Sequence, residues 1–403
     1  MSKTPTSTRI LPITRRTLLK GAAAGTAVSF IPTRFAIGQA AKIKVGLMVA
    51  YSGAFSGPGV SITEGFKLRL NEIGGKIAGR EVEYVQLDDE SAPPKAKDNA
   101  ARLIQRDKVD VLVGSTHSGV AEAMVAVARE EGTFTICPNA GAASITGQMC
   151  APNIFRSSFS NWQPAFPCGK VMVNDGHKKA VMMSWNYPAG HEATGGFKEN
   201  FVANGGTVVK EIFLDFPKVE FQAYLTEIAS IKPDAVFVFF AGAGALKFIQ
   251  DYAAAGLQGK IPLYGSGFIT DGVLKQAGAA AEGIKSTLHY ADALDNPMNK
   301  KFRPAFKAVA NKDADVYAVQ GYDAATMLIK GVEAVKGDLK ATKTLYAAIA
   351  GATIESPRGN FTLGKNHNPI QDIYLRQVKG GEEVVLGVAH KALADPGKGC
   401  SMM

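Results

Sequence analysis

Short apolar runs alternate with longer amphipathic segments along most of the chain after residue 42. The runs are rich in β-branched residues, as is typical of buried strands, and the segments between them carry apolar residues at helical spacing. In the first half, the predicted strands and helices occupy residues 43–49, 61–73, 81–87, 94–106, 109–113, 119–131 and 133–137. Near-continuous apolar strands separated by helices favour a parallel sheet covered on both faces.

The same alternation begins again after an irregular stretch at residues 139–163. The second series predicts elements at residues 164–175, 180–184, 190–204, 207–213, 221–231, 235–240, 244–255 and 261–264. The last third predicts helices at 299–310, 320–336 and 342–349, then strands at 359–363, 372–378 and 384–389. We therefore expect two Rossmann-like α/β lobes that the chain visits more than once, with a hinge between them.

The polar turn after the predicted strand at 109–113 is the first candidate binding site. It reads GSTHSG, and Ser118 stands where the N-cap of the following helix is expected. A turn that leads from a strand into a helix can bind an anion, because the first helical amides and the helix dipole point toward it. An ordinary helix cap explains the same pattern, and the turn alone does not decide between the two.

The first forty residues resemble an export signal rather than part of the fold. They contain a twin-arginine sequence, TRRTLLK at 14–20, then a short apolar run and small residues that predict cleavage near Ala40. They also hold six basic residues and no acid, so the formal charge of +9 falls to about +3 once they are removed. That charge indicates no nucleic-acid partner.

The four cysteines are compatible with disulfides in an oxidising compartment. Cys137 and Cys150 could close a short loop, Cys168 is a third candidate, and the sequence does not fix any pairing. Cys400 lies in a glycine-rich segment, and residues 391–403 are predicted to form a flexible tail. No CxxC spacing indicates a zinc site.

Sequence signatures of catalysis are few. None of the six histidines belongs to an HExxH or a Cys/His cluster, and neither a GxSxG nor a phosphate-binding GxxxxGK[ST] motif occurs. The segment GAGALK at 242–247 is only a partial GxGxxG, which is better explained by close packing of a helix on a strand. We expect no cofactor, no metal and no enzymatic activity.

Several segments together resemble one family. They are KVGLMVAYSGAFSGPG at 44–59, EGFKL at 64–68, GSTHSGV at 114–120, CPNAGAA at 137–143, FRSSFSNWQ at 155–163 and YPAGHE at 187–192. In order and spacing they are similar to the type I periplasmic substrate-binding proteins of ABC transporters, the Leu/Ile/Val-binding group. The resemblance runs from about residue 43 to the final strand.

The resemblance implies a particular domain organisation and role. Residues 41–157 and 289–356 would form the N-terminal lobe, and residues 158–288 and 357–390 the C-terminal lobe, joined by a three-crossover hinge. The protein would be a periplasmic monomer that binds a small carboxylate between its lobes and delivers it to an inner-membrane ABC permease. A ligand-sensing receptor module and, less favoured, an exported enzyme are the alternatives to transport.

The resemblance also implies where the ligand carboxylate binds. The family holds it with a serine at the start of a helix and with amides of a nearby loop, which match Ser118, beside His117 and Gly119, and residues 139–141. The candidate ligand-binding residues are Ser118, Gly119, His117, Asn139, Ala140, Gly141, Phe55, Trp162, Tyr187, Ala189, Gly242, Gly267 and Phe268.

The departures from the family pattern concern the ligand's other end. The usual aromatic residues of the second lobe are replaced by Ala189 and Gly242, and no acid stands near Gly267 to pair with an α-ammonium group. A buried ammonium without a partner is costly, so an amino acid ligand is disfavoured. Phe55, Trp162, Tyr187 and Phe268 could instead enclose a ring, and we expect an aromatic or bulky carboxylate, with branched-chain or other amino acids as the alternative.

Overall fold

The computed structural model describes residues 41–403. The predicted signal peptide, with its cleavage near Ala40, lies outside the described residues. The strands of the described part belong to two sheets, each the centre of one lobe. Two α/β lobes with mostly parallel sheets were predicted, and that prediction is confirmed.

The first sheet has the strand order β2-β3-β1-β4-β5-β6. Its strands are β1 (Ile43–Val49), β2 (Lys76–Ile77), β3 (Arg80–Asp88), β4 (Val111–Gly114), β5 (Phe134–Cys137) and β6 (Ile154–Arg156). All neighbours are parallel except β2, which pairs antiparallel with β3. The sequence pattern missed β2 and β6 because two or three residues are too few to show a period.

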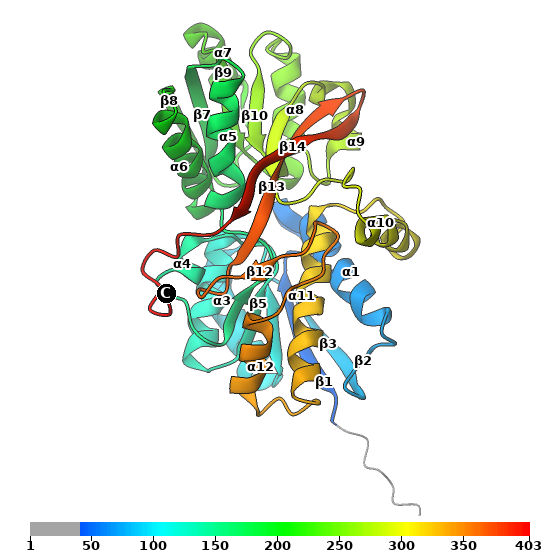
Figure 1. The fold of residues 1–403 in the computed structure, drawn as a ribbon. Coiled ribbons are helices and arrows are strands. Elements are labelled where there is room, and N and C mark those ends of the chain that lie inside the picture. Colours follow the sequence, from blue (N-terminus) through cyan, green and yellow to red (C-terminus); the bar gives the residue numbers. More distant parts are fainter. Residues whose placement is uncertain (1–40) are drawn as a thin grey trace, which may run out of the picture. The chain divides into compact units, whose positions relative to one another are not determined.

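Helices cover both faces of this sheet. They are η1 (Gly53–Phe55), α1 (Ser56–Asn71), α2 (Pro93–Ala101), η2 (Arg102–Arg106), α3 (Ser118–Glu130), α4 (Ala143–Thr146), α11 (Val316–Ala334) and α12 (Thr342–Ala350). Leu47 belongs to the same core cluster as Leu328 of α11, and Met48 to the same cluster as Met124 of α3. Successive β1 side chains therefore enter opposite cores, and α11 lies beside α1 although the two are far apart in sequence (Figure 1).

The second sheet has the order β12-β13-β11-β10-β9-β7-β8, with β14 added to β13. The strands are β7 (Lys179–Asn186), β8 (Thr207–Asp215), β9 (Ala235–Phe239), β10 (Leu263–Ser266), β11 (Lys285–Leu288), β12 (Thr362–Leu363), β13 (Pro369–Lys379) and β14 (Glu382–Leu393). The helices between β6 and α11 are α5 (Trp162–Asn174), α6 (Pro188–Ala203), α7 (Gln222–Ile231), α8 (Gly242–Ala254), η3 (Gly267–Ile269), α9 (Leu274–Ala277), η4 (Gly278–Ala281) and α10 (Pro297–Ala310).

The last two strands form the predicted hairpin. Gly380 and Gly381 turn the chain with φ of 62° and 78°. Two consecutive positive φ angles suit a tight two-residue turn, and glycine adopts them at no steric cost. The hairpin is longer than predicted, and β13 and β14 run together over most of their length (Figure 1).

The chain passes between the lobes after β6, after β11 and before β13. Buried hydrogen bonds tie these crossovers together, since Arg358 donates to the Ser158 carbonyl (2.9 Å) and Gln371 donates to the same oxygen (2.7 Å). Phe361 and Leu363 pack in the core of the first lobe. Thr362 and Leu363 also pair with β13 of the second sheet, so the third crossover lies in this segment, and the lobe boundary expected at 357 stays a prediction.

The end of the chain corrects two expectations. β14 continues to Leu393, and Cys400 forms a disulfide with Cys150 of the first lobe, so the segment expected to be a flexible tail is tied down. Cys137, the candidate partner of Cys150, is a buried free thiol, as is Cys168. The sequence could not reveal this pairing because 250 positions separate the two cysteines.

Candidate functional site

A small cavity of about 20 Å³ lies where the carboxyl ends of strands from both sheets meet. Such strand ends are the usual ligand-binding edge of open α/β sheets. No charged side chain is among the residues that line it. These are Phe55, Pro58, Thr116, Ser118, Asn139, Gly141, Phe159, Asn161, Tyr187, Ala189, Phe239, Ala241, Phe268 and Tyr317.

The turn between β4 and α3 differs from the expected arrangement in one respect. His117, not Ser118, is the N-cap of α3, because its Nδ1 accepts hydrogen bonds from the amides of Gly119 (3.1 Å) and Val120 (3.3 Å). Burial lowers the pKa of His117 to about 4, so the ring is neutral near pH 7. The first helical amides are already bonded, and the side chain of Ser118 is released from capping.

Ser118 instead faces the cavity and takes part in a short polar chain. Asn161 donates through Nδ2 both to Ser118 Oγ (3.2 Å) and to Glu192 Oε2 (2.8 Å). Both carboxylate oxygens of Glu192 lie 3.0 Å from the amide nitrogen of Ala143. Burial raises the pKa of Glu192, while the hydrogen bonds from Asn161 and Ala143 oppose that rise.

Two further hydroxyl groups in the cavity lack a partner among residues 41–403. They are Thr116 Oγ1 and Tyr317 Oη, both buried. A buried hydroxyl without a hydrogen bond is unfavourable, so each is a natural contact for a bound polar group. Asn139 is less available, because its Nδ2 already donates to Gln320 Oε1 (2.7 Å).

Aromatic rings form most of the remaining wall. The predicted residues Phe55, Tyr187 and Phe268 line the cavity, together with Phe159 and Phe239. Phe159 and Phe268 are 4.8 Å apart between ring centroids. A wall of this kind suits a flat apolar ring, which gains buried area and edge or face contacts with the surrounding aromatics.

Six of the predicted ligand-binding residues are not in the cavity lining. Trp162 donates to Glu199 (2.9 Å), packs on Phe166 and lies against Gly196, so it contacts α6 and does not line the cavity. His117 and Gly119 bond each other, because the Gly119 amide donates to His117 Nδ1 at the start of α3. The amide of Ala140 donates to the Ser115 carbonyl. A side chain at Gly242 would meet the Ala54 carbonyl of the first lobe, so that position adds no open space.

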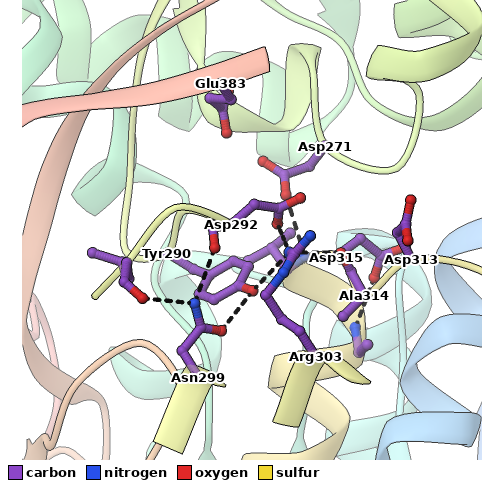
Figure 2. A network of polar contacts seen from close by, with 12 residues as sticks. Asp271, Tyr290, Asp292, Asn299, Arg303, Asp313, Ala314, Asp315 and Glu383 are labelled. Atoms are coloured by element: carbon purple, nitrogen blue, oxygen red, sulfur yellow. Dashed lines mark hydrogen bonds and ion pairs between the residues drawn. The ribbon is translucent and has the colours of Figure 1, made fainter. Parts of the chain in front are cut away.

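Gly267, the sixth, faces a buried arginine. A Cβ at this position would collide with the guanidinium of Arg376, which donates to the Gly267 carbonyl (2.8 Å). The nearest acid, Asp271, forms an ion pair with Arg376 (2.7 Å), and Arg376 also pairs with Glu383 (2.7 Å). Asp271 and Glu383 belong to the polar network of Figure 2, which also includes Asp292. No free acid was expected near Gly267, and the reason is that Asp271, the nearest one, is paired with Arg376.

Several lining residues were not predicted, among them Thr116, Phe159, Asn161, Phe239, Ala241 and Tyr317. Asn161 and Phe159 lie in the irregular stretch before α5, where no period indicates which side chains point inward. Phe239 and Ala241 follow the rule for strand ends and could have been found from the end of β9. Tyr317 comes from α11, which a strand-end rule does not include.

Within residues 41–403, no group of three or more His, Cys, Asp or Glu side chains could hold a metal ion. No helix in that range is both long and apolar enough to cross a membrane. The lining residues offer hydroxyl and amide groups together with aromatic rings. These groups can hydrogen-bond a polar ligand and enclose its apolar part.

A two-lobed α/β fold with an uncharged cavity lined from both lobes defines a ligand-binding protein of the type that encloses a small molecule. Residues 42–382 match the periplasmic binding protein family, and the chain belongs to it. It is therefore a solute-binding protein, as the sequence resemblance implied.

The chain is similar to proteins of known name and to solved structures. The Leu/Ile/Val-binding protein homolog 6 of Brucella melitensis is 30% identical over 348 residues, which cover 85% of this chain and 88% of the relative. A solute-binding protein of an ABC transporter from R. palustris, solved in complex with benzoate, is 53% identical with a TM-score of 0.88, covering 89% of this chain and 99% of that one. Another, from Rhodopseudomonas palustris BisB5 in complex with 3,4-dihydroxybenzoic acid, is 31% identical with a TM-score of 0.84 and the same coverage.

Proposed function

We propose that the protein binds an aromatic monocarboxylate of the benzoate class in the cavity between its lobes. The ring would lie among Phe159, Tyr187 and Phe268, and the carboxylate would accept hydrogen bonds from Ser118 and Thr116. A single observation carries the proposal. The cavity has aromatic walls and unpaired hydroxyl groups but no free acid, because Asp271 is bound to Arg376.

The absence of a charged group in the lining separates the two candidate ligand classes. An α-amino acid brings an ammonium group that must be paired if it is buried. A benzoate needs only donors at one end, which hydroxyl groups provide, and apolar contacts elsewhere. The benzoate-bound relative, at 53% identity, supports the same choice.

Delivery to an inner-membrane ABC permease completes the proposed role. The relatives solved with benzoate and dihydroxybenzoate are described as solute-binding proteins of ABC transporters. We propose that the chain is exported with the signal peptide of residues 1–40, cleaved near Ala40, and acts in the periplasm as a monomer. Branched-chain amino acid transport is the second candidate, because of the names of the Brucella relatives.

Calorimetry on the purified mature protein tests the ligand class. We expect heat and saturable binding with benzoate or a hydroxybenzoate, and none with leucine or valine. Saturable binding of leucine without any binding of an aromatic acid would overturn the proposal and favour the amino acid alternative.

A cavity-filling variant tests the location. Ala189→Leu places a larger side chain in the cavity and should reduce benzoate affinity by at least tenfold. Ala203→Leu, an exposed change near the end of the same helix, is the matched control and should leave affinity unchanged. Equal effects of the two variants would place the ligand elsewhere.

A further inference from the structure

Glu192 joins the two lobes beside the proposed carboxylate site but does not line the cavity. It lies in the first turns of α6 in the second lobe, and both of its oxygens accept from the amide of Ala143, the first residue of α4 in the first lobe. A carboxylate near the N-terminus of a short helix is a favourable but common arrangement. The second contact of Glu192 gives it a more specific role.

That contact fixes the orientation of the Asn161 amide. Asn161 Nδ2 lies 2.8 Å from Glu192 Oε2 and 3.2 Å from Ser118 Oγ. An ionised carboxylate only accepts hydrogen bonds, so the NH₂ group of Asn161, not its oxygen, must face Glu192. The two hydrogens of that group then go to Glu192 and to Ser118.

The orientation of Asn161 decides what Ser118 can do. Ser118 Oγ accepts from Asn161, so the serine hydrogen cannot point toward that amide. Ser118 lines the cavity, and its hydroxyl is left to donate there. If the Asn161 amide were reversed, its oxygen would take the serine hydrogen and Ser118 would present only a lone pair to the ligand.

We infer that Glu192 is a positioning residue that, through Asn161, makes Ser118 a hydrogen-bond donor and so selects a carboxylate over the neutral amide of the same shape. The inference rests on the proposed function, since it assumes that an aromatic carboxylate occupies the cavity. Because Glu192 belongs to one lobe and Ser118 and Ala143 to the other, this orientation is complete only when the two lobes are in contact.

The variant Glu192→Gln tests this role with little change of shape. Both oxygens of Glu192 lie 3.0 Å from the Ala143 amide, so a glutamine must place its own NH₂ either against that donor or toward Asn161. Turning it toward Asn161 reverses the Asn161 amide. Glu199→Gln, on the same helix but bonded to Trp162 at an exposed position, is the matched control.

Affinities for benzoate and benzamide are measured by calorimetry for the wild type and both variants. We expect Glu192→Gln to weaken benzoate binding about tenfold, the effect of one hydrogen bond to a charged group, and benzamide binding less than twofold. Glu199→Gln should change neither. Should Glu192→Gln fold poorly, Glu192→Ala also frees Asn161 and should lower the benzoate-to-benzamide preference in the same direction.

An equal loss for both ligands would make Glu192 a simple contact between lobes and overturn the inference, as would unchanged benzoate affinity. A wild-type protein that binds no aromatic acid would overturn the proposed function itself. The two failures are therefore distinguishable.

Discussion

Arg376 and Asp271 form a buried ion pair in the second lobe, with Nη1 2.7 Å from Oδ2. The other oxygen of Asp271 accepts from the amide of Val316 (3.2 Å), so both carboxylate oxygens are occupied. The sequence resemblance implies that proteins of the Leu/Ile/Val-binding group have an acid near this position, which pairs with the ammonium group of the ligand. Here the nearest acid pairs with the protein's own arginine, and the guanidinium lies against Gly267.

Gly267→Ala should destabilise the protein, because the new methyl group would meet the Arg376 guanidinium and Leu288. Overpacking of this kind costs about 1–3 kcal/mol. Urea unfolding followed by circular dichroism measures the loss. Gly195→Ala, in α6 with open space around it, is the control and should be neutral or slightly stabilising. Equal stability of the two variants would show that Arg376 can move aside.

The parts of the fold that were predictable from sequence are those with strong local signals. The apolar run of β4 and the glycine-bounded turn after it located Ser118, and Gly380-Gly381 located the last hairpin. The capping role of His117 was not predictable, since serine is the commoner N-cap and lies at the next position.

The other features that the sequence did not predict depend on tertiary structure. Trp162 and Asn161 are neighbours at the start of one helix, and only the packing of α5 on α6 places the tryptophan against α6 while the asparagine reaches Ser118. The Cys150–Cys400 pairing likewise depends on where β14 ends.

Cys400→Ser should lower stability by about 2–5 kcal/mol, because the disulfide closes a very long loop and restricts the unfolded chain. Chemical unfolding of the oxidised protein measures the loss, and a reductant should shift the wild type by a similar amount. Cys150→Ser should match Cys400→Ser, and the double variant should lose no more than either. Insensitivity of the wild type to reductant would contradict the pairing.

His117 should make stability fall on acidification. Its pKa is lowered by burial from 6.5 to about 4, so below pH 6.5 the unfolded chain binds a proton that the folded protein does not. The contribution of neutral His117 to the free energy of unfolding is fully present above pH 6.5 and is lost as the pH falls to about 4. The total loss is about 3 kcal/mol.

The variant His117→Asn isolates this effect, since an asparagine oxygen can accept the same amide hydrogen bonds without titrating. Free energies of unfolding at a series of pH values should fall less steeply for the variant than for the wild type between pH 6.5 and 4. Parallel curves would mean that the pKa of His117 is the same in the folded and the unfolded protein.

Tyr317→Phe should change ligand preference more than stability. The Tyr317 hydroxyl is buried in the cavity without a partner among the described residues, so its removal should leave the unliganded protein equally or more stable. The ring hydroxyl of a hydroxybenzoate can form a hydrogen bond with the Tyr317 hydroxyl, whereas benzoate has no ring hydroxyl to do so. We expect the variant to lose about fivefold or more in affinity for the best-bound hydroxybenzoate isomer. Benzoate affinity should change less than twofold, and an equal change for both ligands would contradict the pairing of Tyr317 with a ring hydroxyl.

Ser118→Ala should weaken benzoate binding at least tenfold, because it removes a donor to a charged group in a cavity that has no cation. Stability should change little, since His117 rather than Ser118 caps α3 and Asn161 keeps its bond to Glu192. Calorimetry measures the affinity and thermal unfolding the stability, with the exposed Ser230→Ala as control. A loss of stability without a loss of affinity would reverse the roles assigned to Ser118 and His117, and would move the carboxylate away from the turn after β4.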